Sequence, residues 1–132
     1  MKSDLRRIIR CAVCGRVVSE DLSGAGALVC CNQPMELVVT NIDESATAEK
    51  HLPVITETAS GYLVKVGNIP HPMTIEHCLL WIELAVDGKA YRTYLNPGRS
   101  TDSSPQAEFS VPKGKQLTAR TYCNIHGLWQ VG

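Results

Sequence analysis

A thiol and an imidazole stand close together in the C-terminal stretch YCNIHGLW, residues 122–129, where Cys123 precedes His126 by three positions. Thiolate and neutral imidazole are both good ligands for transition metals such as zinc, copper and iron. Three further histidines lie far upstream: His51, His71 and His77. The pattern predicts that the C-terminal stretch completes a metal site whose other ligands come from earlier segments.

Two prolines enclose His71 in the segment IPHPM. Pro70 and Pro72 restrict the backbone on both sides of His71 and favour an extended conformation, which lowers the entropic cost of aiming its imidazole. His77 is expected to open a strand, in which neighbouring side chains point to opposite faces. Its neighbour Cys78 is therefore predicted to be a buried small apolar residue and not a ligand.

Four imidazoles and one thiolate make a set of five ligands, which is too many for a structural zinc site. Such a set leaves one position of an octahedron open, and an open position indicates chemistry. A blue-copper site is excluded because it needs one upstream histidine and a methionine after His126, whereas the last methionine is Met73. The predicted site is therefore one that binds and transforms a small molecule.

Four more cysteines cluster in the first part of the chain: Cys11, Cys14, Cys30 and Cys31. The CxxC turn followed by Gly15 lets backbone amides point at sulfur, and four thiolates suit a tetrahedral zinc or iron. Neighbouring side chains of a strand point to opposite faces, so Cys30 and Cys31 reach one metal only if the backbone turns sharply there. A purely structural zinc clip remains an alternative to iron at this group.

Composition limits the remaining function classes. Thirteen basic and thirteen acidic residues cancel, so nothing in the net charge indicates a nucleic-acid or membrane partner. The charged start MKSDLRRIIR lacks a signal-peptide pattern, and no stretch has the length of a membrane span. A cytoplasmic location is therefore expected, where six cysteines indicate metal ligands or catalytic thiols more than disulfides.

The segments that must position the candidate metal ligands have the pattern of short strands. The segments GYLVKV, LLWIELAV, AYRTYL, AEFSV and QLTARTY are separated by clusters of Gly, Pro, Asp and Ser, and Asp87-Gly88 is a hairpin signal. This spacing predicts an antiparallel sandwich or barrel from about residue 42 to the end of the chain.

Together, the motifs resemble one family in its order along nearly the whole chain: CxxCG, a later CC, EKHxP, HPM, EH before WIEL, and YCNxHGLW. The chain is similar to desulfoferrodoxin, the two-iron form of superoxide reductase. The resemblance implies an all-β fold, with a small desulforedoxin-like domain over residues 1–40 and an immunoglobulin-like antiparallel β-sandwich over residues 41–132.

The resemblance also implies two iron centres. A ferric centre would be held by Cys11, Cys14, Cys30 and Cys31. A second iron, cycling between ferrous and ferric states, would have His51, His71, His77 and His126 as equatorial ligands and Cys123 as the axial ligand.

The implied activity is the one-electron reduction of superoxide to hydrogen peroxide, without dismutation to dioxygen, in oxidative stress defence. Lys50 would steer the anion and order a proton-delivering water, while Glu49 would bind the ferric iron after turnover and displace the product. The resemblance further implies an electron donor such as rubredoxin and a homodimer formed through the N-terminal domain.

The chain departs from the family pattern at Thr74, Ile75 and Glu76, at Cys78, and at Gln130, none of which is a predicted ligand. These differences affect the charge expected near the site and leave the predicted iron ligands in place. A second hypothesis of a different class is a non-enzymatic protein, either an iron electron-transfer protein or a zinc-stabilised scaffold. The metal ambiguity of the four-cysteine group is its main support.

Overall fold

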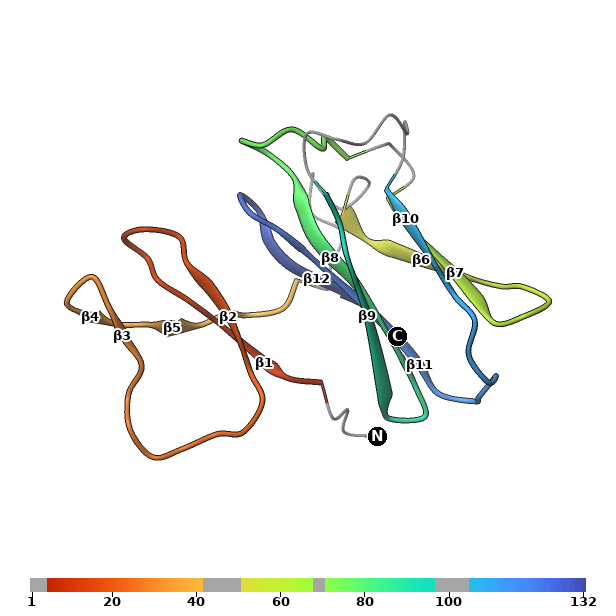
Figure 1. Cartoon of the computed structure of the whole chain (residues 1–132), viewed down its shortest axis with the longest axis horizontal. Helices are drawn as coiled ribbons and strands as arrows, with labels where there is room; N and C mark the ends of the chain where they lie inside the picture. The colour runs from red at the N-terminus through yellow and green to blue at the C-terminus, as the bar shows by residue number, and fades with distance from the viewer. Residues whose placement is uncertain (1–4, 42–50, 68–70, 97–104) are drawn as a thin grey trace. The chain divides into compact units, whose positions relative to one another are not determined.

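The computed structural model describes residues 5–41, 51–67, 71–96 and 105–132, which form twelve β-strands (Figure 1). The chain folds into two compact units, one spanning Leu5–Val39 and the other containing Thr40–Gly132. The all-β class predicted from the sequence is confirmed. Among the described residues, no helix has the length and apolar character that crossing a membrane requires.

The first unit is built from short strands. The central strand β1 (Arg7–Arg10) pairs antiparallel with β2 (Val17–Glu20) on one side and β5 (Glu36–Leu37) on the other. A separate hairpin joins β3 (Val29–Cys30) to β4 (Gln33–Pro34). The buried apolar side chains among the described residues of this unit are Ile8, Ile9 and Cys11. So small a core favours a metal as an additional source of stability.

The second unit contains two antiparallel sheets. One has the order β10-β7-β6 and consists of β6 (Pro53–Glu57), β7 (Tyr62–Val66) and β10 (Gln106–Phe109). The other has the order β12-β11-β8-β9 and consists of β8 (Leu79–Val86), β9 (Lys89–Tyr94), β11 (Leu117–Cys123) and β12 (Gly127–Val131). Three and four strands in two sheets are the arrangement of an immunoglobulin-like sandwich, which confirms the predicted fold class.

Alternating side chains from both sheets form the core of the sandwich. Tyr62, Val64 and Val66 of β7 point inward from the three-stranded sheet. They pack in one core with Ile82 and Leu84 of β8, in the four-stranded sheet. This period of two is what a strand with one face on a core requires. The hairpin predicted at Asp87-Gly88 joins β8 to β9, and both residues have the positive φ of a type I′ turn, 49° and 87°.

The strand directions bring one set of strand ends together. Pro53, at the start of β6, pairs with Val66, at the end of β7, and Cys123, at the end of β11, pairs with Leu79, at the start of β8. The turn that joins β11 to β12 lies at the same end (Figure 1). Segments that are far apart in the sequence therefore meet at one end of the sandwich.

Candidate metal centres

The four cysteines of the first unit come from two turns. Cys11 and Cys14 follow β1, where Gly15, with φ of 81°, closes the turn by donating its N–H to the Cys11 carbonyl at 2.9 Å. The Cys14 N–H points at Cys11 Sγ, 3.4 Å away. This is the amide-to-sulfur arrangement that the CxxCG motif predicts.

The other two cysteines occupy the β3–β4 hairpin. Cys31 and Asn32 have φ of 54° and 61°, a left-handed conformation that is uncommon outside glycine. The sharp turn predicted from the adjacency of Cys30 and Cys31 is thus confirmed. Because of this turn, Cys30 and Cys31 can face the same point as Cys11 and Cys14, and the four sulfur atoms lie within 4.8 Å of one another.

The sulfur atoms fit a tetrahedral metal. Cys14 Sγ and Cys30 Sγ are 3.7 Å apart, and two thiolates bound to a tetrahedral metal by bonds of about 2.3 Å lie about 3.8 Å apart. The amide of Cys14 lowers the pKa of Cys11 to about 6, whereas hydrogen bonding to Cys14 raises the pKa of Cys31 to about 12. A metal ion would therefore be needed to hold Cys31 as a thiolate beside Cys11.

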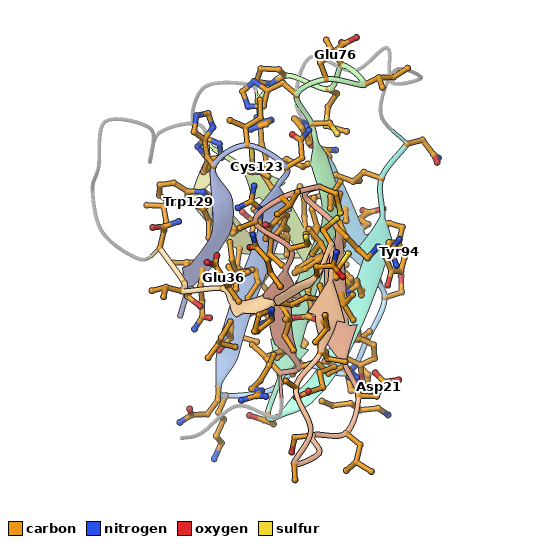
Figure 2. The ribbon with its side chains drawn as sticks, turned by 90° about the vertical axis from the view of Figure 1, so that its left-hand side faces the viewer. Asp21, Glu36, Glu76, Tyr94, Cys123 and Trp129 are labelled. Atoms are coloured by element: carbon orange, nitrogen blue, oxygen red, sulfur yellow. The ribbon has the colours of Figure 1, made fainter. Side chains whose placement is uncertain are left out.

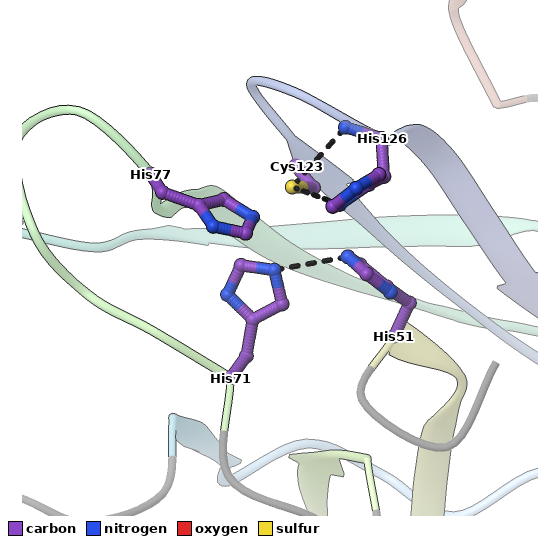
Figure 3. Close-up of side chains that lie close together, drawn as sticks. All are labelled: His51, His71, His77, Cys123 and His126. Atoms are coloured by element: carbon purple, nitrogen blue, oxygen red, sulfur yellow. Dashed lines mark hydrogen bonds between the residues drawn. The ribbon is translucent and has the colours of Figure 1, made fainter. Parts of the chain in front are cut away.

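A second group gathers at the end of the sandwich where the strand ends meet. Figure 3 shows four imidazole rings arranged edge to face around a common space, with the sulfur atom of Cys123 beside it. One potential ligand atom from each side chain lies within 4.8 Å of all the others: His51, His71, His77, Cys123 and His126. His51 precedes β6, the next two histidines lie between β7 and β8, and Cys123 and His126 flank the end of β11.

Two imidazole nitrogens in this group are spaced as neighbouring ligands of one metal. His51 Nε2 and His71 Nε2 are 3.0 Å apart, and two nitrogens at right angles, each about 2.1 Å from a metal, are about 3.0 Å apart. His71 Nδ1 donates to the Pro72 carbonyl at 2.7 Å, which leaves Nε2 as the nitrogen with the free electron pair.

Burial keeps His71 in the form that binds a metal. The residue is 4% exposed, and desolvation lowers the pKa of His71 to about 4, with a smaller contribution from the neighbouring histidines. The ring is neutral at pH 7, and a neutral imidazole is what a metal requires.

Cys123 contributes the buried sulfur atom of the group. Burial raises the pKa of the Cys123 thiol, while the backbone amides of His126 and Ile125 act in the opposite direction. The N–H of His126 lies 3.3 Å from Cys123 Sγ and the ring Nδ1 lies 3.7 Å from it. A bound metal would stabilise the thiolate in this enclosed position.

Trp129 supports two of the histidines. Its indole stacks on His51 and donates from Nε1 to the His126 carbonyl at 3.2 Å. Asn41 Nδ2 donates to the same carbonyl at 3.3 Å. Cys123 and Trp129 lie at the same end of the unit (Figure 2). Sequence reasoning assigned no role to Asn41, Trp129 or Asn124, although the position of Asn124 between two candidate ligands was a usable signal.

The remaining sequence predictions have different outcomes. Cys78 is buried and stands outside both metal-binding groups, as expected. The expectation that His77 opens a strand is wrong, because β8 begins at Leu79 and His77 lies in a turn closed by a hydrogen bond from Thr74 N to its carbonyl. Glu49 and Lys50 lie outside the described residues.

Comparison with known proteins gives matches over both units. The family model described as Desulfoferrodoxin matches residues 43–132, and the one described as Desulfoferrodoxin, N-terminal domain, matches residues 4–38. A desulfoferrodoxin homolog of Methanothermobacter thermautotrophicus is 48% identical over 127 residues, which cover 96% of this chain and 98% of that protein. A desulfoferrodoxin of Nitratidesulfovibrio vulgaris is 45% identical over 123 residues, which cover 93% of this chain and 93% of that protein.

Solved structures give a consistent result. The superoxide reductase of Treponema pallidum aligns over 100% of both chains with a TM-score of 0.69 and 25% identity. The superoxide reductase (1Fe-SOR) of Giardia intestinalis aligns over 63% of this chain and 95% of its own, with a TM-score of 0.54 and 29% identity.

Proposed function

Because the chain belongs to the desulfoferrodoxin family, we propose that it is a superoxide reductase, which converts superoxide to hydrogen peroxide with one electron and two protons and forms no dioxygen. The observation that carries this function is the convergence of four imidazoles and one thiol from separate segments, with ligand atoms within 4.8 Å of one another. The two groups of side chains match the two iron centres of desulfoferrodoxins.

The donor set fits iron at the five-residue group. When bound, a ferrous ion supplies the electron, and four neutral imidazoles with one thiolate leave a net charge of +1 that attracts an anion. Hydrogen bonds within the protein orient the side chains that would bind this ion. The Pro72 carbonyl orients His71, and the amides of Ile125 and His126 lie against the Cys123 sulfur.

Lys50 and Glu49 are proposed to act on the substrate and the product. Lys50 precedes the ligand His51 and adds a positive charge that steers superoxide and orders a proton-delivering water. With iron bound, Glu49 would offer it a carboxylate after electron transfer and would thereby favour the release of hydrogen peroxide. Their positions directly before His51 support both roles.

Lys50→Ala should lower the second-order rate with superoxide and weaken its dependence on ionic strength. Lys113→Ala is the matched control, because it also removes one positive charge. Lys113 lies between β10 and β11, away from the described metal-binding groups, and its ion pair with Glu57 is exposed and contributes little to stability. Equal rates for both variants would remove Lys50 from the mechanism.

The four-cysteine iron is proposed as an optional electron relay. The physiological donor would be a small electron carrier such as rubredoxin. A cytoplasmic location is supported by the use of the cysteines, because five of the six belong to the two metal-binding groups and none of the six is in a disulfide. A homodimer through the N-terminal unit is supported by six exposed apolar side chains: Val13, Leu22, Leu28, Val29, Leu37 and Val39. Sedimentation equilibrium tests the dimer.

The decisive experiment mixes the reduced protein with about one equivalent of superoxide, as a one-electron reaction at one open site requires. We expect a thiolate-to-iron charge-transfer band that grows in proportion to superoxide, one peroxide per superoxide, and no dioxygen. Release of dioxygen would indicate dismutation instead. A colourless, unchanged protein would favour the zinc-stabilised scaffold.

A further inference from the structure

Asn124 lies between Cys123 and His126, yet its side chain bonds to a different loop. Its Oδ1 accepts the N–H of Cys78 at 2.9 Å, and its Nδ2 donates to the carbonyl of Glu76 at 2.9 Å. Its backbone N–H also donates to the Cys78 carbonyl at 3.1 Å. One side chain thus holds the backbone on both sides of His77.

Thr74 holds the backbone of His77 itself. Thr74 N donates to the His77 carbonyl at 3.0 Å, and the Thr74 hydroxyl accepts the N–H of His77 at 3.0 Å. The backbone groups from the Glu76 carbonyl to the Cys78 carbonyl therefore all have partners, and every one of these bonds comes from Thr74 or Asn124. Hydrogen bonds are the main constraint in this exposed turn, where Ile75 is 75% exposed.

We propose that Asn124 and Thr74 are positioning residues that hold His77 against the Cys123–His126 turn before a metal binds. A ligand that is already in place loses less conformational freedom on binding, so the metal is retained for longer. An asparagine side chain can bind both backbone groups at once. Its amide oxygen accepts from the N–H of Cys78, and its amide nitrogen donates to the carbonyl of Glu76.

This inference rests on the proposed function only in treating His77 as a metal ligand. Neither positioning residue is itself a ligand.

The first test uses the metal-free full chain and amide hydrogen exchange. We expect protected amides at His77 and Cys78 in the wild type, and loss of protection at Cys78 in Asn124→Ala and at His77 in Thr74→Val. Unprotected amides at both positions in the wild type would overturn the proposal, whatever the protein does with superoxide.

The second test measures the release of Fe²⁺ from the loaded chain to a chelator without oxygen. Loss of a partner that orients a ligand typically costs 10–100-fold in metal affinity, so we expect release from the five-residue group to be about 10-fold faster in Asn124→Ala. Thr74→Val should show a smaller increase, and Thr74→Ser, which keeps the hydroxyl, should restore the wild-type rate.

Two controls separate positioning from general damage. Ile75→Ala changes an exposed side chain of the same turn and should leave release unchanged, and release from the four-cysteine group should be equal in all variants. Unchanged release in Asn124→Ala would overturn the proposal. If the exchange and release effects appear in a chain that does not reduce superoxide, the proposed function fails and the positioning role stands.

Discussion

The indole of Trp129 stacks on the imidazole of His51, with ring centroids 4.8 Å apart and an angle of 16° between the planes. Trp129 belongs to β12, at the end of the chain, and His51 precedes β6, the first strand of the sandwich. The same indole donates to the His126 carbonyl. One buried side chain thereby ties the first and last histidines of the five-residue group together.

Replacement of Trp129 should separate its two contacts. Trp129→Phe keeps an aromatic face on His51 and loses the indole hydrogen bond, at a cost of about 1 kcal/mol in the free energy of unfolding. Trp129→Leu loses both contacts and leaves a cavity, which should cost about 3 kcal/mol. Urea unfolding of the metal-free protein measures both values. Equal losses would show that neither the aromatic contact with His51 nor the volume that Phe fills and Leu does not contributes to stability.

Cys14→Ser should bleach the four-cysteine centre and leave superoxide reduction largely unchanged. Cys14 is an exposed member of that group, and the five-residue group has its own complete set of ligands. Visible absorption reports the first effect, and the rate of superoxide consumption by the reduced protein reports the second. Loss of most of the activity would show that the relay is obligatory.

Cys78 and Cys123 should respond differently to replacement, although both are buried thiols and burial raises the pKa of each. Cys78→Ala should keep the iron of the five-residue group and lose about 1 kcal/mol of stability through a small cavity. Cys123→Ala should lose the charge-transfer band. Metal analysis together with the visible spectrum distinguishes them, and a missing band in Cys78→Ala would contradict the assignment.

Removal of the charge of Glu83 is predicted to destabilise the sandwich strongly, because it leaves two guanidinium groups without their buried partner. The Glu83 carboxylate is 2% exposed and accepts from Arg120 Nε at 2.7 Å and from Arg92 Nη2 at 2.9 Å. Arg92 also lies over the ring of Trp81. Glu83→Gln removes the charge that both guanidinium groups share, and breaking a buried pair in this way costs about 3–5 kcal/mol.

Thermal and urea unfolding measure this loss. The double variant Glu83→Leu with Arg120→Met should recover part of it, because apolar side chains can replace a buried ion pair. A loss in Glu83→Gln no larger than that of an exposed pair, such as Lys113 with Glu57, would contradict the prediction.

Local chemistry explains what could be predicted without the structure. Leu79–Val86 forms the strand that its apolar and β-branched residues indicate, and Asp87-Gly88 forms the expected turn, because strand preference and positive φ are properties of short segments. The sharp turn at Cys31 follows from the need for adjacent side chains to face one point.

Contacts between distant segments could not be predicted in this way. The burial of Glu83 runs against the expectation that a charged residue is exposed, and it depends on the register that places Glu83 opposite Arg92 on one side and Arg120 on the other. The strand β12 was not predicted, because its five residues are held by pairing with β11 and by a parallel bridge between Trp129 and the distant Asn41, contacts that the sequence does not show. His77 lies in a turn and not in a strand, since Thr74 satisfies its backbone groups.

The sequence by itself determined the all-β class and the motifs that carry thiol and imidazole side chains, because side-chain chemistry and strand periodicity belong to the residues themselves. Only the tertiary structure decided that Trp129 supports His51 and that Asn124 holds the turn of His77. Both contacts join segments that are remote in the chain. The pairing of β8 with β11 brings Asn124 to the turn of His77, and the packing of β12 against β6 brings Trp129 onto His51.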